Sequence, residues 1–182
     1  MPNVWYYFSM TLFLSLITIL QSFSISLGVG SSTLAITNFF VAIADGTIDE
    51  TERRMMGVVY VVLRVAMGLI LVTTVLLVGQ QYGTSGFGEM TGFTLGQVTA
   101  LAVLYINAML MTAHLVPSTF GPAIQAGSWY TLGTLGALQI LGLTGFSYIH
   151  FLMGYITWVV LAIGIVNGIM AILKDRKERQ EA

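Results

Sequence analysis

The sequence lacks cysteine altogether and contains very little charge. The absence of cysteine excludes disulfides, thiolate metal ligands, cysteine nucleophiles and iron–sulfur clusters. With 7 basic and 8 acidic residues the net charge is −1, so the chain has no basic face for nucleic acid. Charged residues make up 8% of its 182 residues, against about a quarter in a soluble domain. A chain this poor in charge cannot cover a surface that faces water, and we expect it to be embedded in a lipid bilayer.

Long uncharged runs take the place of charge. They predict helices, because lipid forces a backbone to make its hydrogen bonds within each segment, and none of the runs alternates as a membrane β-strand would. We predict an all-α fold, a polytopic integral membrane helical bundle that forms a single transmembrane domain over residues 1–182. Its five predicted transmembrane helices cover residues 8–44, 55–79, 95–116, 122–143 and 148–173, followed by a tail over residues 174–182.

The first of these segments is longer than one ordinary span. Residues 5–44 carry no charge, and as a single helix they would be about 60 Å long, twice the hydrocarbon thickness of about 30 Å. Two short spans, giving six in total, would need a turn near QSFSISLG at residues 21–28, which contains no proline or asparagine. We therefore expect one long helix whose first two turns lie at or beyond the interface, and we keep six spans as the alternative.

Six of the 7 basic residues form two clusters that set the predicted orientation. One cluster is Arg53 and Arg54, and the other is the tail after Leu173. Basic flanks stay on the cytoplasmic side, and four predicted spans separate the clusters, so both clusters can lie there. The prediction is a multi-pass protein of the inner cell membrane, with its N-terminus outside and its C-terminus in the cytoplasm.

The stretch ADGTIDETERR, residues 44–54, is the densest charge before the tail. A calcium loop would need oxygen ligands at the positions that Val41 and Ile43 occupy, so we expect no metal site. The residues fit a corner between two helices better. Thr47 and Glu50 have the spacing of a capping box for the second helix, where the helix dipole also favours acidic residues.

Arg64 is a charged residue in the middle of a predicted span. It lies ten residues past Arg54, about 15 Å further along a helix. A charge at that depth is costly and usually faces the bundle interior or water. Arg64 could contact an anion or carboxylate along a pathway, or it could snorkel to the interface or bind backbone carbonyls.

Uncharged polar residues in the other spans complete the candidate site. An asparagine inside a membrane helix needs a partner, either as contact between helices or as the lining of a polar path. The predicted binding residues are Arg64, Asn107, Gln125, Trp129 and Tyr130.

The two histidines do not suggest a cofactor. His114 and His150 are predicted near opposite sides of the membrane, so they cannot jointly hold one haem iron. Ligation by either histidine alone stays open, although a histidine at the interface is the more common outcome. No serine nucleophile motif or acid at triad spacing accompanies either residue. We expect no metal, no cofactor and no enzymatic activity.

Four stretches, GVGSSTLAITNFF, ADGTIDETE, INAML and GSWYTLGTLGAL, resemble a group of small bacterial membrane proteins without an assigned function. The resemblance covers residues 28–138. It departs at Gln97, where a lysine is expected, and at Arg64, where an apolar or aromatic residue is expected. It implies the bundle topology and no activity, and it directs attention to Asn107 and to SWY at residues 128–130.

The leading functional hypothesis is an integral membrane protein that binds or passes a small solute or ion through its helical bundle. An alternative is a non-catalytic accessory or scaffold subunit of a membrane complex. Small-residue faces, at Gly164 and Gly168 and at Ser24, Gly28 and Ser32, could hold such a partner or a second copy of the chain. A further alternative is a binder of porphyrin, quinone or lipid. The lipid bilayer is the expected partner in every case, and nucleic acid in none.

Overall fold

The computed structural model describes residues 4–45, 49–117 and 120–181. Within these ranges the chain forms five α-helices and one short 3-10 helix, and no strand. The elements are α1 Val4–Asp45, α2 Glu50–Tyr82, η1 Phe87–Glu89, α3 Gly92–Thr112, α4 Gly121–Ile140 and α5 Tyr148–Glu181. The predicted all-α fold is confirmed.

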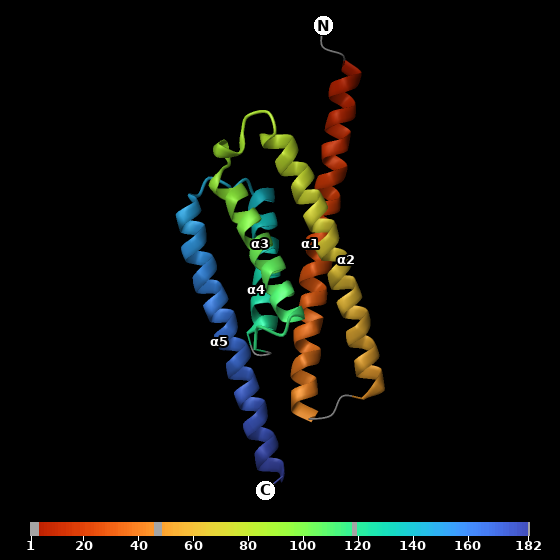
Figure 1. The fold of residues 1–182 in the computed structure, drawn as a ribbon, viewed down its shortest axis with the longest axis vertical. Coiled ribbons are helices and arrows are strands. Elements are labelled where there is room, and N and C mark those ends of the chain that lie inside the picture. The colour runs from red at the N-terminus through yellow and green to blue at the C-terminus, as the bar shows by residue number, and fades with distance from the viewer. Residues whose placement is uncertain (1–3, 46–48, 118–119, 182) are drawn as a thin grey trace.

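The helices run up and down beside one another, and the bundle has two distinct ends (Figure 1). We call the end that carries Arg53, Arg54 and the basic last turns of α5 the charged end. The other end carries residues 83–91, which connect α2 to α3, and we call it the loop end. α4 packs against α1, α3 and α5, while α1 also packs along α2.

α1 is one continuous helix of 42 residues, as expected for a segment without a helix breaker. At about 1.5 Å per residue it is about 63 Å long, and its first turns extend past the loop end of the bundle (Figure 1). Its exposed hydroxyls bond to its own backbone: Ser15, Ser22 and Ser26 each donate to the carbonyl four residues earlier, at 2.9, 3.0 and 3.0 Å. These bonds satisfy the hydroxyls on a face that is otherwise apolar.

Four helices of the described chain are long and apolar enough to cross a membrane: α1 over Phe8–Ala42, α2, α3, and α5 over Tyr148–Arg179. α4 is not among them, although its 20 residues give it a length of about 30 Å. Glycine, serine, threonine and glutamine fill many of its positions and lower its hydropathy. The structure therefore contains the five expected helices, of which four meet the requirements of a membrane span.

Several helix ends differ from the predicted ones. α3 ends at Thr112 rather than near residue 116, because His114 adopts a left-handed conformation with φ of 56°. α4 ends at Ile140 rather than near residue 143, because Gly142 has φ of 72°. In the other direction, α5 continues to Glu181 through the predicted tail.

The corner between α1 and α2 has a different cap from the predicted one. The Asp49 carboxylate accepts a hydrogen bond from the backbone N–H of Glu52 at 2.6 Å, and the Glu52 carboxylate accepts one from the N–H of Asp49 at 3.1 Å. The capping box thus uses Asp49 and Glu52, because α2 begins at Glu50 and its cap must directly precede it. The predicted cap, Thr47, lies outside the described residues.

The core lies at mid-height between α1, α2, α3 and α4, and Phe151, Tyr155 and Val159 of α5 also pack in it. Trp129, Ala66, Ala100 and Leu104 are fully shielded there. The six-membered ring of Trp129 lies so close to Gly28 that a Cβ built on that glycine would be 2.2 Å from the ring. The small-residue face of α1 therefore serves contact within the chain, because only a glycine allows α1 and α4 to approach so closely.

Candidate functional site

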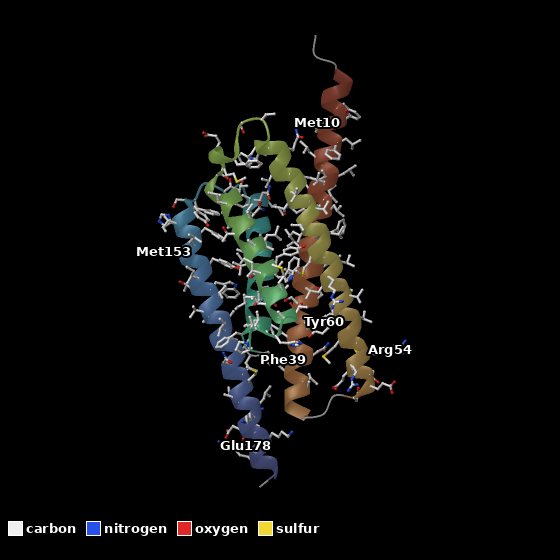
Figure 2. All side chains as sticks on the ribbon, viewed as in Figure 1. Met10, Phe39, Arg54, Tyr60, Met153 and Glu178 are labelled. Atoms are coloured by element: carbon white, nitrogen blue, oxygen red, sulfur yellow. The ribbon has the colours of Figure 1, made fainter. Side chains whose placement is uncertain are left out.

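Arg64 lines a cavity of about 330 Å³ that lies toward the charged end, between α1, α2, α3 and α4. All four helices contribute side chains to it. Figure 2 labels two of them, Phe39 of α1 and Tyr60 of α2. We call it the Arg64 cavity; its polar or sulfur-bearing lining residues are Ser32, Tyr60, Arg64, Met67, Met111, Thr112 and Gln125.

The guanidinium of Arg64 has no ion pair and no hydrogen bond among the described residues. Among all the residues that the structure describes, the salt bridge found joins Arg179 and Asp175 at 2.8 Å, on the exposed surface of α5. No acidic side chain lines the Arg64 cavity. Arg64 lies 14 residues beyond Glu50, the first residue of α2, and so about 21 Å along the helix. Arg64 is an exposed residue at membrane depth, and it brings an unpaired positive charge to the wall of the cavity.

A pair of amides lies where α3 and α4 meet at the cavity, with Gln125 in the cavity wall and Asn107 behind it. Asn107 and Gln125 are both buried. The Asn107 amide nitrogen donates to the carbonyl of Gly121 and to the side-chain oxygen of Gln125, at 3.0 Å each. Both acceptors are oxygens, so the orientation of the Asn107 amide is fixed: turning it over would place oxygen against oxygen.

This arrangement also fixes the orientation of Gln125. Its oxygen is held by Asn107, so its NH₂ group is directed elsewhere. The one contact of that nitrogen is the sulfur of Met67, at 3.7 Å, and Met67 itself lines the cavity. Sulfur is a weak acceptor, so Gln125 has hydrogen-bond donor capacity to spare on the side of the Arg64 cavity.

Trp129 and Tyr130 lie further along α4 and do not line this cavity. Trp129 is fully buried in the core, and its indole N–H has no hydrogen-bond partner among the described residues. The Tyr130 hydroxyl bonds to that of Thr33 on α1 at 2.7 Å. Of the five predicted binding residues, the structure brings Arg64 and Gln125 to one cavity, with Asn107 directly behind Gln125.

A second, more polar cavity lies toward the loop end, between the same four helices. It has a volume of about 690 Å³ and is lined by amides and hydroxyls without any charged side chain. We call it the glutamine cavity, after Gln21, Gln80, Gln81, Gln97 and Gln139. Its threonines are Thr18, Thr74, Thr91, Thr94 and Thr144.

Sequence reasoning missed the glutamine cavity. Gln97 and Gln139 are uncharged polar residues within predicted spans, but they were not among the predicted binding residues. The available signal was the pairing of polar positions on neighbouring helices, such as Gln21 of α1 and Thr74 of α2, whose side chains hydrogen-bond at 3.2 Å in a buried position.

The apolar core separates the two cavities. Along α3, residues 91–97 line the glutamine cavity, residues 108–112 line the Arg64 cavity, and the buried Ala100, Leu101 and Leu104 lie between them. The order along α4 is the reverse, with Gln125 on one side of Trp129 and Gln139 on the other. Two polar spaces thus lie on one axis, closed from each other by a layer of packed side chains.

A groove of different character lies between α4 and α5. Its volume is about 460 Å³, and Phe146, Phe151, Tyr155 and Trp158 line it. The rings of Phe146, Phe151 and Tyr155 are stacked in sequence, with centroids 6.5 and 5.5 Å apart. His150 lies in this groove, and its Nδ1 hydrogen-bonds with Ser147.

Neither histidine lies in a metal-binding arrangement. His114 follows the last turn of α3, toward the charged end, whereas His150 lies in the first turn of α5 at the loop end. Over residues 4–45, 49–117 and 120–181, no group of three or more histidine, aspartate or glutamate side chains could hold a metal ion.

No protein-family model, curated protein or solved structure matches this chain. Together, the fold and the four apolar helices define a helical membrane protein.

Proposed function

We propose that the protein binds a small polar solute or ion between α1, α2, α3 and α4 and passes it across the bilayer. The observation that carries this proposal is the placement of two polar cavities on one axis, between the same four helices, with a packed core between them. Polar groups inside a membrane bundle are costly unless they have partners or water, and they mark solute pathways. A closed layer between two cavities is what a carrier or a gated path requires at rest.

The size of the cavities limits the solute. Pockets for drug-sized ligands have volumes of about 300–1,000 Å³, and the Arg64 cavity, at about 330 Å³, lies at the lower limit of that range. The lining offers an arginine, an amide and hydroxyls. These features support a solute of a few non-hydrogen atoms that carries polar groups.

We further propose the orientation and the location. α4 acts as a fifth span, shielded from lipid by α1, α3 and α5, so that its low hydropathy is tolerated. The charged end lies in the cytoplasm, since both basic clusters are there and basic flanks remain on that side. The protein then belongs to the inner cell membrane, and the N-terminal turns of α1 lie outside.

Solute flux into proteoliposomes tests the proposal. The panel contains a neutral polar solute such as glycerol, a monovalent cation and a monovalent anion. The informative variant is Ala108→Phe, which places a ring in the Arg64 cavity. Its matched control is Ala171→Phe, which places the same ring on the exposed surface of α5.

We expect wild type and Ala171→Phe to pass at least one member of the panel, and Ala108→Phe to fall to the level of empty liposomes. The proposal is overturned if wild type passes no member faster than empty liposomes. It is also overturned if Ala108→Phe conducts as well as wild type.

A second candidate function is the binding of a flat, lipid-soluble ring such as a quinone, and the α4–α5 groove favours it. Stacked aromatic side chains offer a face to such a ring, and His150 offers a polar group at one end of the groove. Trp158 lines the groove, so a short-chain quinone should quench its fluorescence. Gly154→Leu fills the groove and should reduce the quenching; equal quenching in the variant excludes this function.

A further inference from the structure

We propose that the Arg64 cavity is a binding site for a small monovalent anion, such as a halide or the carboxylate of a short organic acid. This inference rests on the proposed function, since it names the class of solute that the α1–α4 path accepts. Three properties of the cavity support it: its charge, its hydrogen-bond donors and its size.

The first property is the charge. The Arg64 guanidinium lines the cavity without an ion pair or a hydrogen bond among the described residues. The nearest acids along its own helix, Glu50 and Glu52, lie 12 or more residues away, or about 18 Å. No side chain with a negative charge lines the cavity. Arg64 is exposed on the wall of the cavity, so an anion that enters can reach its guanidinium. At membrane depth a charge needs such an anion, or water, beside it.

Snorkelling does not remove this need. A helical side chain points back toward the N-terminus of its helix, which for Arg64 is the charged end. The distance of about 15 Å from Arg64 to Arg54 along the helix exceeds the reach of one arginine side chain. The guanidinium therefore stays at the level of the Arg64 cavity, whose wall it helps to form, rather than reaching the charged end.

The second property is the set of donors. Asn107 holds the oxygen of Gln125, so Gln125 has its NH₂ group available on the cavity side. The hydroxyls of Ser32 and Tyr60 also line the cavity, and neither has a hydrogen-bond partner among residues that the structure describes. The lining is mostly apolar, and its N–H and O–H donors are concentrated at Arg64, Gln125, Ser32 and Tyr60. An anion accepts from all of them, whereas a cation would meet the positive charge of Arg64.

The third property is the size, together with the valence of the anion. One guanidinium neutralises one negative charge, so a divalent anion would retain a net charge inside the bundle. A cavity of about 330 Å³ accepts a halide, formate or acetate together with a few waters. The same chemistry, a single negative charge on a small group, could also come from the phosphodiester of an anionic lipid, and the experiment separates the two sources.

Equilibrium binding of radiolabelled chloride and formate provides the test. The purified chain is placed in nanodiscs of phosphatidylcholine alone, with gluconate as the bulky background anion at constant ionic strength. We expect saturable binding with one site per chain. Arg64→Gln should weaken it at least about tenfold, the effect of losing a charge-assisted hydrogen bond.

Three further variants sharpen the result. Arg53→Gln removes an exposed charge from the first turn of α2 and should leave binding unchanged. Arg64→Lys keeps the charge and should retain more binding than Arg64→Gln, which separates loss of the site from loss of the fold. Gln125→Glu replaces the donor by an acceptor of nearly the same shape and should abolish binding.

The lipid arm repeats the titration in nanodiscs that contain phosphatidylglycerol. If phosphatidylglycerol competes with chloride and formate, its headgroup reaches the same site. That result supports an anion site that accepts both free anions and lipid headgroups. The proposal is overturned by two results together. Wild type binds neither chloride nor formate in either lipid, and phosphatidylglycerol raises the free energy of unfolding of wild type and Arg64→Gln by the same amount.

This outcome is distinguishable from failure of the proposed function. Anion binding without flux would overturn passage across the bilayer and leave the site intact. Flux of a neutral solute through a wild-type chain that binds neither chloride nor formate would overturn the anion site and leave the path intact.

Discussion

α4 and α5 are neighbours in the sequence and in the bundle, yet they have opposite surroundings. α4 has 20 residues, with nine of them buried, and it is not apolar enough to count as a membrane span. α5 has 34 residues, is strongly apolar, and exposes Ile156 and Val160 by 60% and 63%. In water the more buried helix would be the more apolar one. The opposite order is expected of a helix bundle in lipid, where an apolar surface faces the bilayer and polar groups find partners inside the bundle.

This contrast indicates that functional polar side chains of such a chain lie in the interior of the bundle. The amides of Asn107 and Gln125 and the hydroxyl of Ser128 all face other protein groups. The hydroxyl of Thr157 on the exposed part of α5 bonds only to its own backbone, at Met153, over 2.8 Å. Polar side chains that bond to another helix therefore mark the interior of the bundle. The two cavities between α1, α2, α3 and α4 lie in that interior.

The largest effect is expected from breaking the approach of α1 to α4. Gly28→Leu places a side chain where the Trp129 ring already lies, so we expect a loss of about 3 kcal/mol or more, as for severe overpacking. Gly164→Leu on α5 meets no neighbour within 4 Å and should leave stability nearly unchanged. Unfolding titrations in mixed detergent micelles measure both. Equal losses would contradict the contrast between the two helices.

A smaller effect is expected from the hydroxyl that links α4 to α5. Ser128 donates to, or accepts from, the Tyr155 hydroxyl at 2.8 Å, and both residues are buried. Ser128→Ala leaves the Tyr155 hydroxyl without this partner and should cost about 1–3 kcal/mol. Thr157→Ala is the matched control and should cost less than about 0.5 kcal/mol. The same micelle titration applies, and a control as costly as Ser128→Ala would show that the interhelical bond is not the cause.

The smallest effects are expected at the two tryptophans, and they differ in size. The Trp158 indole N–H donates to the carbonyl of Gly127 at 3.0 Å, so Trp158→Phe should cost about 1 kcal/mol. Trp129 buries an indole N–H without a partner. Trp129→Phe removes some packing but also removes that unpaired donor, and the second change partly offsets the first. We therefore expect Trp129→Phe to lower the free energy of unfolding by less than Trp158→Phe does. Thermal melts followed by circular dichroism compare the two, and a larger loss at Trp129 would contradict this expectation.

The sequence predicted the long helices well, because lipid makes their requirements strict. α1 could be predicted as one helix since residues 21–28 offer no breaker, and the start of α5 at Tyr148 follows the break at LTGFS. The ends of α3 and α4 could not be placed, since they depend on left-handed conformations at His114 and Gly142. Of these two, only the glycine carries a local sequence signal.

The candidate site was predictable only in part. Arg64 is conspicuous because it is a charge within an apolar run, and Gln125 because it is an amide in a span. The contact of Gly28 with Trp129 joins positions about a hundred residues apart, and no periodicity reveals it. The glutamine cavity takes side chains from four helices, so it emerges only from the order in which the helices pack.

The absence of cysteine allows the most direct test of the central claim, which is that two polar cavities open toward opposite sides of the membrane around a closed core. Single cysteines are introduced at Gln97 in the glutamine cavity, at Ala108 in the Arg64 cavity and at Ala100 in the core between them. A membrane-impermeant thiol reagent is then applied to each side of sealed vesicles. We predict that Gln97→Cys is labelled only from the outside, Ala108→Cys only from the cytoplasmic side, and Ala100→Cys from neither. Labelling of Gln97→Cys and Ala108→Cys from the same side, or of Ala100→Cys from either, would contradict the account.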